Sequence, residues 1–245
     1  MLCLENVTKS FDGFMAVSDV SMRVSRREIC SIIGPNGAGK TTIFNLITGH
    51  LRSDRGAVFF RDQEISRLHP YDIVRLGIGR SFQRLNIFPK LSVFQNVQAA
   101  VISHKRKGLD LFGRAEDYFR NETYGILETV GLKDHAHKIG ASLSYGYQKQ
   151  LELGIALACE PELLLLDEPT AGMSAADTRD AISIIRSIVR DQGITLLIVE
   201  HDMEVVFAIS EHIVVLHQGK IIKDGLPEEV RKDSGVQKIY LGENQ

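Results

Sequence analysis

The sequence lacks three features that would each point to a class of protein: an excess of positive charge, paired cysteines and a long apolar run. Its 245 residues carry 29 basic and 31 acidic side chains, a net charge of −2. This balance argues against a nucleic-acid binder that depends on neutralising phosphates. The three cysteines (Cys3, Cys30 and Cys159) form no CxxC pair, so we expect reduced apolar residues rather than disulfides.

No segment has the length and apolarity needed to cross a bilayer. The longest stretch without Asp, Glu, Lys or Arg is Leu91–His104, which has 14 residues and contains Gln and Asn. A membrane-spanning helix needs about 20 predominantly apolar residues. The first residues also show no basic stretch followed by an apolar core, as a secretory signal would. We therefore expect a cytoplasmic protein that does not itself span the membrane.

The sequence does contain the periodicity of an α/β fold, and its length suits one such domain with a sizeable insertion. Residues 2–24 alternate apolar and polar around Asp12-Gly13, which predicts antiparallel strands. Ile29–Ile33, Leu163–Leu166 and Thr195–Val199 are near-continuous apolar runs, typical of parallel strands covered on both faces. A crossover helix is predicted over Ala175–Gln192, and later elements are a strand over His212–Leu216, a hairpin at Gln218–Lys220 and a short helix from Pro227.

The stretch from Arg84 to Cys159 departs from that alternation. A period of about 3.6 residues predicts helices over Val93–Val101, Glu116–Val130 and Gln148–Ala158. The expected fold is therefore a single α/β domain over 1–245 with a parallel sheet and an N-terminal antiparallel β element. Its core would comprise residues 1–83 and 160–245, with a helical subdomain, 84–159, inserted.

A glycine-rich turn between a predicted strand and a predicted helix carries the strongest chemical signal. It fits G-x-x-x-x-G-K-[ST] and consists of Gly34, Pro35, Asn36, Gly37, Ala38, Gly39, Lys40, Thr41 and Thr42. In such a loop the backbone N–H groups and the helix N-terminus face phosphates. Lys40 would bridge the β and γ oxygens, and Thr41 would offer its hydroxyl to Mg²⁺. A chance glycine-rich turn would lack the flanking strand and helix, so we expect a nucleotide site.

Two carboxylates follow a buried strand at the sheet edge where the phosphate loop should emerge. They are Asp167 and Glu168, after the run Leu163–Leu166. Neighbouring strand residues point to opposite sides, so the two acids can have different roles. Asp167 would hold Mg²⁺ through its water shell, and Glu168 would accept a proton from the water that attacks the γ-phosphate. A solvated acidic strand end is the alternative.

Two further polar residues stand at predicted strand ends. His201 follows Thr195–Val199 and could hydrogen-bond the γ-phosphate or the attacking water. Gln83 follows residues 78–82, and its amide could reach Mg²⁺ or water. By spacing alone, a structural role for either residue is the competing interpretation.

Taken together, these motifs resemble the ATPase subunit of ABC transporters over essentially the whole chain. The distinguishing segment, Leu143-Ser-Tyr-Gly-Tyr-Gln148, is similar to the L-S-G-G-Q signature of that family. The resemblance implies that Phe11 stacks on adenine, Gln83 couples the site to membrane subunits and His201 senses the γ-phosphate. It also implies that Ser144 and Gly146 contact ATP held by a second subunit, in a homodimer or a heterodimer of paralogues.

The match departs from the family pattern in two places. Tyr145 and Tyr147 stand where Gly and Gln are usual, and Ala171–Ser174 replaces S-A-L-D. Finer features resemble the ATPases of branched-chain amino-acid importers, and urea, amide and lipopolysaccharide-export ATPases share part of them. The implied partners are transmembrane permease subunits and, indirectly, a solute-binding protein, with ATP and Mg²⁺ as cofactors and the cytoplasmic face of the membrane as location.

Three other kinds of protein share some of these motifs. A soluble ABC ATPase of DNA repair or the ribosome would carry long coiled coils or a tandem duplication, and this chain has one phosphate loop and no heptad run. A nucleotide-regulated binding module with a dead site is disfavoured by the presence of both Glu168 and His201. A phosphate-loop kinase would leave the signature-like segment without a purpose.

Overall fold

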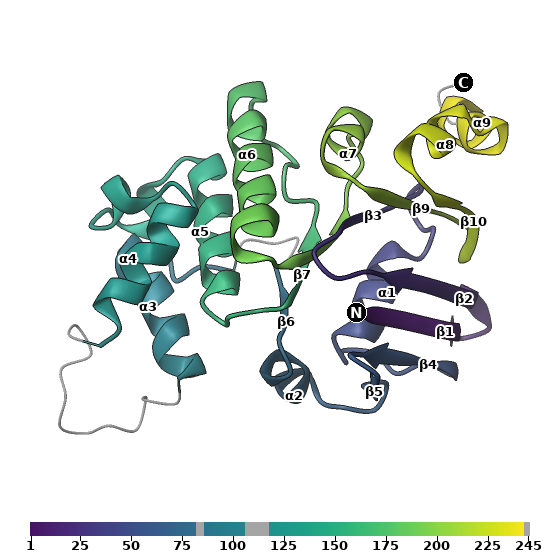
Figure 1. Cartoon of the computed structure of the whole chain (residues 1–245), viewed down its shortest axis with the longest axis horizontal. Helices are drawn as coiled ribbons and strands as arrows, with labels where there is room; N and C mark the ends of the chain where they lie inside the picture. The colour runs from purple at the N-terminus through teal and green to yellow at the C-terminus, as the bar shows by residue number, and fades with distance from the viewer. Residues whose placement is uncertain (82–85, 106–117, 243–245) are drawn as a thin grey trace.

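An antiparallel sheet forms one end of the molecule in the computed structural model, which describes residues 1–81, 86–105 and 118–242 (Figure 1). Its strand order is β2-β1-β4-β5. The strands are β1 (Leu2–Phe11), β2 (Phe14–Val24), β4 (Arg55–Phe60) and β5 (Gln63–Glu64). The turn at Asp12-Gly13 places Phe11 opposite Phe14, which confirms the antiparallel pairing predicted from the alternation.

The second sheet is the predicted parallel sheet, with strand order β10-β9-β3-β8-β7-β6. The strands are β3 (Ile29–Ile33), β6 (Ile78–Arg80), β7 (Leu163–Asp167), β8 (Thr195–Val199), β9 (His212–His217) and β10 (Lys220–Gly225). All neighbouring pairs are parallel except β10 with β9, which form the expected hairpin. The carboxyl ends of β3, β7 and β8 therefore meet at one edge.

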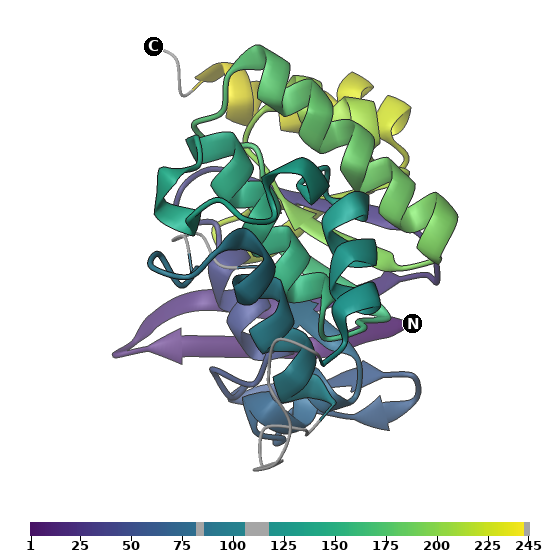
Figure 2. The same ribbon diagram turned by 90° about the vertical axis from the view of Figure 1, so that its left-hand side faces the viewer.

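Helices cover the parallel sheet and extend beyond it. They are α1 (Lys40–Ile47), α2 (Pro70–Arg75), α3 (Val93–His104), α4 (Arg120–Thr129), α5 (Tyr145–Leu157), α6 (Ala175–Gln192), α7 (Met203–Ile209), α8 (Pro227–Lys232) and α9 (Ser234–Gly242), with short 3₁₀ turns at Lys133–His135 and Gly140–Ser142. Figure 2 brings α3, α4 and α5 toward the viewer as one helical group. Across the described part of the chain, none of these helices combines the length and hydropathy of a membrane span.

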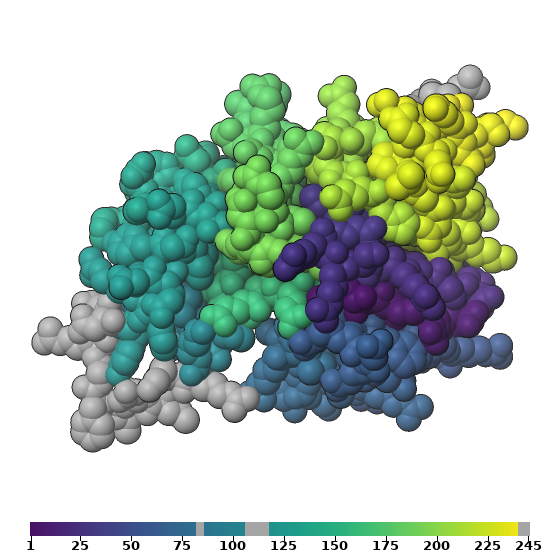
Figure 3. Space-filling model, viewed as in Figure 1, coloured from purple at the N-terminus to yellow at the C-terminus, as the bar shows by residue number. Residues whose placement is uncertain are grey.

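Alternate residues of each central strand enter different apolar cores. On β7, Leu163 and Leu165 face α1 and the antiparallel sheet, whereas Leu164 and Leu166 face α3, α4, α5 and α6. A third, smaller core joins β3 and β9 to α7, α8 and α9. Because successive strand side chains point to opposite faces, a strand covered on both sides must be apolar throughout. The space-filling view shows the helical residues at one end and the N-terminal strands at the other (Figure 3).

Helix boundaries differ from the prediction where local capping decides them. Helix α5 begins at Tyr145, three residues before the predicted start, because the Ser144 hydroxyl caps it by accepting from the Tyr147 N–H. The single final helix predicted from Pro227 is two helices, α8 and α9, separated at Asp233. Residues 116 and 117, where the prediction started another helix, lie outside the described part, within which α4 begins at Arg120.

Candidate nucleotide and hydrolysis site

The phosphate loop, the end of β7 and the end of β8 surround one hollow of about 340 Å³. Its wall combines backbone, hydroxyl, ammonium, carboxylate and aromatic groups. The lining residues are Phe11, Phe14, Ala16, Asn36, Gly37, Ala38, Gly39, Lys40, Thr41, Thr42, Glu168, Val199 and His201. The structure thus brings together residues that the sequence separates by up to 190 positions, from Phe11 to His201.

Two glycines allow the loop to take its tight path from β3 to α1. A Cβ on Gly34 would lie 2.2 Å from the Leu216 carbonyl oxygen, and one on Gly39 would lie 2.5 Å from that of Ala16. Gly39 also has φ 106°, a conformation that residues with a side chain rarely adopt. Larger residues would push the loop away from β9 and β2, so the glycines set where the amides point.

Lys40 is buried at the start of α1 and its ammonium group lies along the loop. Its Nζ donates to the carbonyl oxygens of Gly34 at 2.6 Å and Pro35 at 2.9 Å. The side chain is therefore held close to the backbone that would surround a phosphate. Thr41 follows at the helix N-terminus and is exposed to the same hollow.

Glu168 and His201 meet across the hollow, because β7 and β8 are neighbouring parallel strands. His201 Nε2 lies 3.0 Å from Glu168 Oε1, and both side chains are partly exposed. Glu168 adopts φ 51° immediately after β7, and its backbone N–H donates to the Val199 carbonyl oxygen at 2.8 Å. This turn directs the carboxylate into the hollow, where a carboxylate beside an imidazole can accept a proton from water.

Asp167 points elsewhere, which agrees with the division expected for adjacent strand residues. It is 2% exposed, and its Oδ2 lies 3.3 Å from Arg80 Nη2. Burial raises the pKa of this carboxyl, and the neighbouring Arg80 guanidinium opposes the rise. Burial in turn lowers the pKa of Arg80.

Arg80 was not among the residues that sequence reasoning selected. It donates to Asn45 Oδ1 at 2.6 Å and to Thr48 Oγ1 at 3.3 Å, and its guanidinium lies over the Phe44 ring. It thereby connects α1 to the carboxyl end of β7. The available signal was a charged residue inside the short apolar strand at 78–80, which only a buried partner explains.

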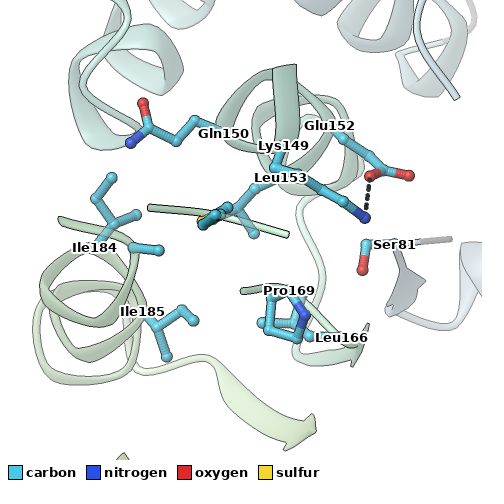
Figure 4. A pocket seen from close by; sticks show the side chains of 11 residues that line it. Ser81, Lys149, Gln150, Glu152, Leu153, Leu166, Pro169, Ile184 and Ile185 are labelled. Atoms are coloured by element: carbon cyan, nitrogen blue, oxygen red, sulfur yellow. Dashed lines mark ion pairs between the residues drawn. The ribbon is translucent and has the colours of Figure 1, made fainter. Parts of the chain in front are cut away.

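A second buried ion pair lies within α5, on the side of the helix near this sheet edge (Figure 4). Lys149 Nζ and Glu152 Oε2 are 3.6 Å apart, and each side chain is 5% exposed. In Figure 4 the Lys149 ammonium points toward Ser81, whose hydroxyl accepts from the Asp167 N–H at 3.4 Å. The helix that begins with the signature segment thus places a buried ammonium group near the carboxylate of Asp167, where, against the rise caused by burial, it lowers the pKa of that group.

The signature residues lie at the far end of the same helix. Ser144 is exposed at the α5 N-cap, and a Cβ on Gly146 would meet Asp177 of α6 at 2.9 Å. The Tyr145 ring packs over Gly172, in the loop that follows Glu168. Neither Ser144 nor Gly146 lines the hollow, so within one chain the signature segment does not reach the phosphate loop.

Two aromatic residues line the hollow at its hairpin end. Phe11 is 41% exposed and Phe14 is 67% exposed, and the two residues are opposite one another across the turn. Phe11 was predicted, whereas Phe14 was missed although the hairpin register places it beside Phe11. Gln83, assigned to the nucleotide and Mg²⁺, lies outside the described residues.

The two predicted Mg²⁺ ligands that the structure describes are oxygen groups, the Thr41 hydroxyl and the Asp167 carboxylate, and Mg²⁺ is usually held by one or two carboxylates together with waters and substrate phosphates. Thr41 lines the hollow, whereas the Asp167 carboxylate is buried against Arg80 and is not part of its wall. Within the described residues there is no cluster of three or more His, Cys, Asp or Glu that could hold a metal ion alone.

A phosphate loop between β3 and α1, with a carboxylate and a histidine at the ends of the neighbouring strands, defines a nucleotide-binding ATPase of the phosphate-loop class. The family model described as "ABC transporter" matches residues 17–171. The chain therefore belongs to the ABC transporter family, and it is an ATP-binding, ATP-hydrolysing subunit.

Individual relatives match over nearly the full length. The high-affinity branched-chain amino acid transport ATP-binding protein LivG of Salmonella typhimurium is 36% identical, covering 99% of this chain and 98% of that protein. The lipopolysaccharide export system ATP-binding protein LptB of Haemophilus influenzae is 35% identical, with the same coverage. A crystal structure of a nucleotide-free ATP-binding cassette from an ABC transporter superposes with a TM-score of 0.87 at 30% identity, covering 98% of both chains.

Proposed function

We propose that this ATPase powers the import of branched-chain amino acids or of a related small amino acid or amide. The subgroup rests on the relative LivG and on the sequence features that resemble it. The hydrolytic role rests on one observation above all, the contact of His201 Nε2 with Glu168 Oε1 at 3.0 Å in the hollow that Lys40 lines. A binding module without catalysis would not need this pair.

The first role of the site is to hold ATP. We assign the triphosphate to the loop Gly34–Thr42 and the N-terminus of α1, where backbone N–H groups favour anions. Lys40 would exchange its carbonyl partners for the β and γ oxygens. Phe11, with Phe14 beside it, offers a flat apolar surface to adenine, and aromatic stacking on a base contributes about 1–3 kcal/mol.

The second role is to move a proton and position water. Glu168 would accept the proton of the attacking water at its carboxylate, and His201 would orient the carboxylate and hydrogen-bond the γ-phosphate. Thr41, Asp167 and Gln83 would hold Mg²⁺, which supplies charge neutralisation to the phosphates when bound. Bulk water, apart from the attacking molecule, would be excluded once the hollow is covered.

That cover would be a second ATPase subunit. Ser144 and the N-terminus of α5 carry groups suited to a phosphate, yet they lie outside their own chain's hollow. A head-to-tail dimer, of identical or paralogous chains, would bring Ser144 and Gly146 of each subunit to the ATP of the other. Two ATP molecules would then lie at the interface.

We place the membrane subunits at a groove between α2 and α3. The groove has a volume of about 490 Å³ and is lined by Tyr71, Val74, Arg75, Phe88, Ala99, Ala100, Ser103, His104 and Cys159. Phe88 is 56% exposed there. Ile87, the residue before Phe88, is half-buried against the helical core. A short helix of a permease subunit would fit the apolar part.

The remaining assignments follow from that arrangement. The ATPase would attach peripherally to the cytoplasmic face of the membrane through its permease subunits and serve a solute-binding protein indirectly, without nucleic acid. We divide the single domain 1–245 into a core, 1–83 and 160–245, and a helical subdomain, 84–159. The helical part would carry the signature and its own side of the groove together as the dimer closes.

Copurification from membranes tests the subgroup. The expected result is recovery of permease subunits, and reconstituted complexes should take up leucine, isoleucine or valine in an ATP-dependent manner. Recovery of a lipopolysaccharide-export complex would instead favour the alternative, for which the 35% identity to LptB is the supporting observation.

A further inference from the structure

Glu200, the residue before His201, has a buried carboxylate beside the pair formed by Glu168 and His201. It follows β8 directly, precedes His201 and is 3% exposed. A buried carboxylate is costly unless its oxygens accept hydrogen bonds. The partners of Glu200 therefore indicate what its burial stabilises.

Each carboxylate oxygen of Glu200 is bonded to a different strand end. Oε1 accepts from the backbone N–H of Thr170 at 3.0 Å and from the Thr170 hydroxyl. Oε2 accepts from the backbone N–H of His201 at 2.9 Å. Thr170 is itself buried, two residues beyond Glu168. One carboxylate thus joins the turn after β7 to the turn after β8.

Two other hydrogen bonds hold the start of the turn after β7 and the end of the turn after β8. The Glu168 N–H donates to the Val199 carbonyl oxygen, and Asp202 Oδ1 accepts from the Glu204 N–H at 2.9 Å to cap α7. Beyond the bond of the Glu168 N–H to β8, Glu200 joins the two turns, since its Oε1 is bonded to Thr170 and its Oε2 to the His201 N–H. Thr170 also begins the loop to Gly172, against which Tyr145 of the signature helix packs.

We infer that Glu200 is a positioning residue for ATP hydrolysis: its carboxylate holds the Glu168 turn and the His201 backbone at the separation that the 3.0 Å pair requires. Glu200 does not line the hollow, so it acts through those two residues and not on the nucleotide. Catalytic groups must be held within about 0.5 Å of the productive geometry, and a displacement of about 1 Å can cost roughly 100-fold in rate. This inference rests on the proposed roles of Glu168 and His201.

The test compares turnover with ATP affinity in Glu200 variants of the complete ATPase. Glu200→Ala should lower kcat roughly 100-fold and leave the Kd for ATP within about twofold, since the phosphate loop is untouched. Glu200→Gln should restore part of the rate, because its amide oxygen can still accept from Thr170 while its NH₂ group cannot accept from the His201 N–H. Thr170→Val, which removes one hydroxyl, should give a smaller loss of kcat.

Glu211→Gln is the matched control. Glu211 Oε2 accepts the backbone N–H of Ile29 at 3.3 Å, at the edge of the sheet away from the hollow, so kcat should stay at the wild-type value. A folded Glu200→Ala protein with kcat within threefold of wild type, or with equal losses in kcat and ATP affinity, would overturn the inference. If Glu200→Ala does not fold, Glu200→Gln and Thr170→Val decide by the same criterion.

The role of Glu200 and the proposed role of Glu168 can be tested separately. Wild-type turnover in Glu168→Gln would remove Glu168 as the base whatever Glu200 does. Loss of turnover in Glu168→Gln with normal turnover in the Glu200 variants would leave the base assignment intact and reject the role of Glu200 alone.

Discussion

His201 Nε2 lies 3.0 Å from Glu168 Oε1, although 32 residues separate the two along the chain. The contact arises because β7 and β8 are neighbouring parallel strands whose carboxyl ends lie side by side. It places a proton acceptor and an imidazole in the hollow that the phosphate loop also lines.

Replacing Lys40 should weaken the binding of ATP. In Lys40→Ala the triphosphate loses a charged hydrogen-bond donor, which contributes about 1.5–3 kcal/mol, so ATP affinity should fall tenfold or more. Titration with a fluorescent ATP analogue measures this. Unchanged affinity would contradict the assignment of the loop.

Glu168→Gln should separate binding from turnover. The amide has nearly the same volume and cannot accept a proton from water, so we expect kcat to fall roughly 100- to 10,000-fold while ATP binding persists. ATP retained in the site should stabilise a dimer, visible by size-exclusion chromatography with light scattering. Turnover at the wild-type rate would show that another group is the base.

Ser144→Arg tests the second subunit. The exposed N-cap of α5 lies away from its own hollow, so the variant should bind ATP normally as a monomer but fail to dimerise and hydrolyse. Mixing it with Lys40→Ala chains should restore activity, because one of the two composite sites is then intact on both faces. Full activity of a strictly monomeric protein would disprove the composite site.

Phe88→Glu tests the membrane groove. The side chain is 56% exposed, so the free energy of unfolding should change by no more than about 0.5 kcal/mol. ATP binding by the isolated subunit should persist, whereas copurification with permease subunits should be lost. Tyr71→Phe, which removes only a hydroxyl in the same groove, is the control. Misfolding of the Phe88 variant would assign the residue to the core.

Arg80→Met should destabilise the fold in a pH-dependent manner. Removing one partner of a buried ion pair costs about 3–5 kcal/mol, because the other charge is left buried. Burial already raises the pKa of Asp167 and Arg80 opposes the rise, so the variant's carboxyl should have a higher pKa still. A raised pKa destabilises the fold while the group is ionised, so the loss in Tm should be larger at pH 8 than at pH 5.

Two controls accompany the Arg80 variant. Arg80→Met combined with Asp167→Asn removes both charges and should recover much of the stability at pH 8. Arg61→Met removes an arginine that also lies over a phenylalanine ring and pairs with a carboxylate, but at a half-exposed site, so its effect should be small at both pH values. A Tm loss independent of pH would contradict the electrostatic explanation.

The sequence by itself determined the local elements whose signals are short in range. The glycine-rich turn, the apolar strands around it and the helix over Ala175–Gln192 were predicted with nearly the observed bounds, because apolar period and glycine conformation act within a few residues. The same signals pointed to Lys40, Asp167, Glu168 and His201. The start of α5 was placed three residues late, because a serine cap is a weaker signal than periodicity.

Only the tertiary structure decided which side chains meet. The strand order β3-β8-β7 puts Glu168 against His201, and β6 beside β7 puts Arg80 against Asp167. Strand order depends on how the helices cover each face of the sheet, which no local pattern encodes. Arg80 pairs with Asp167 and Glu200 bonds Thr170, both far along the chain, so their chemistry became visible only when packing brought those neighbours into contact.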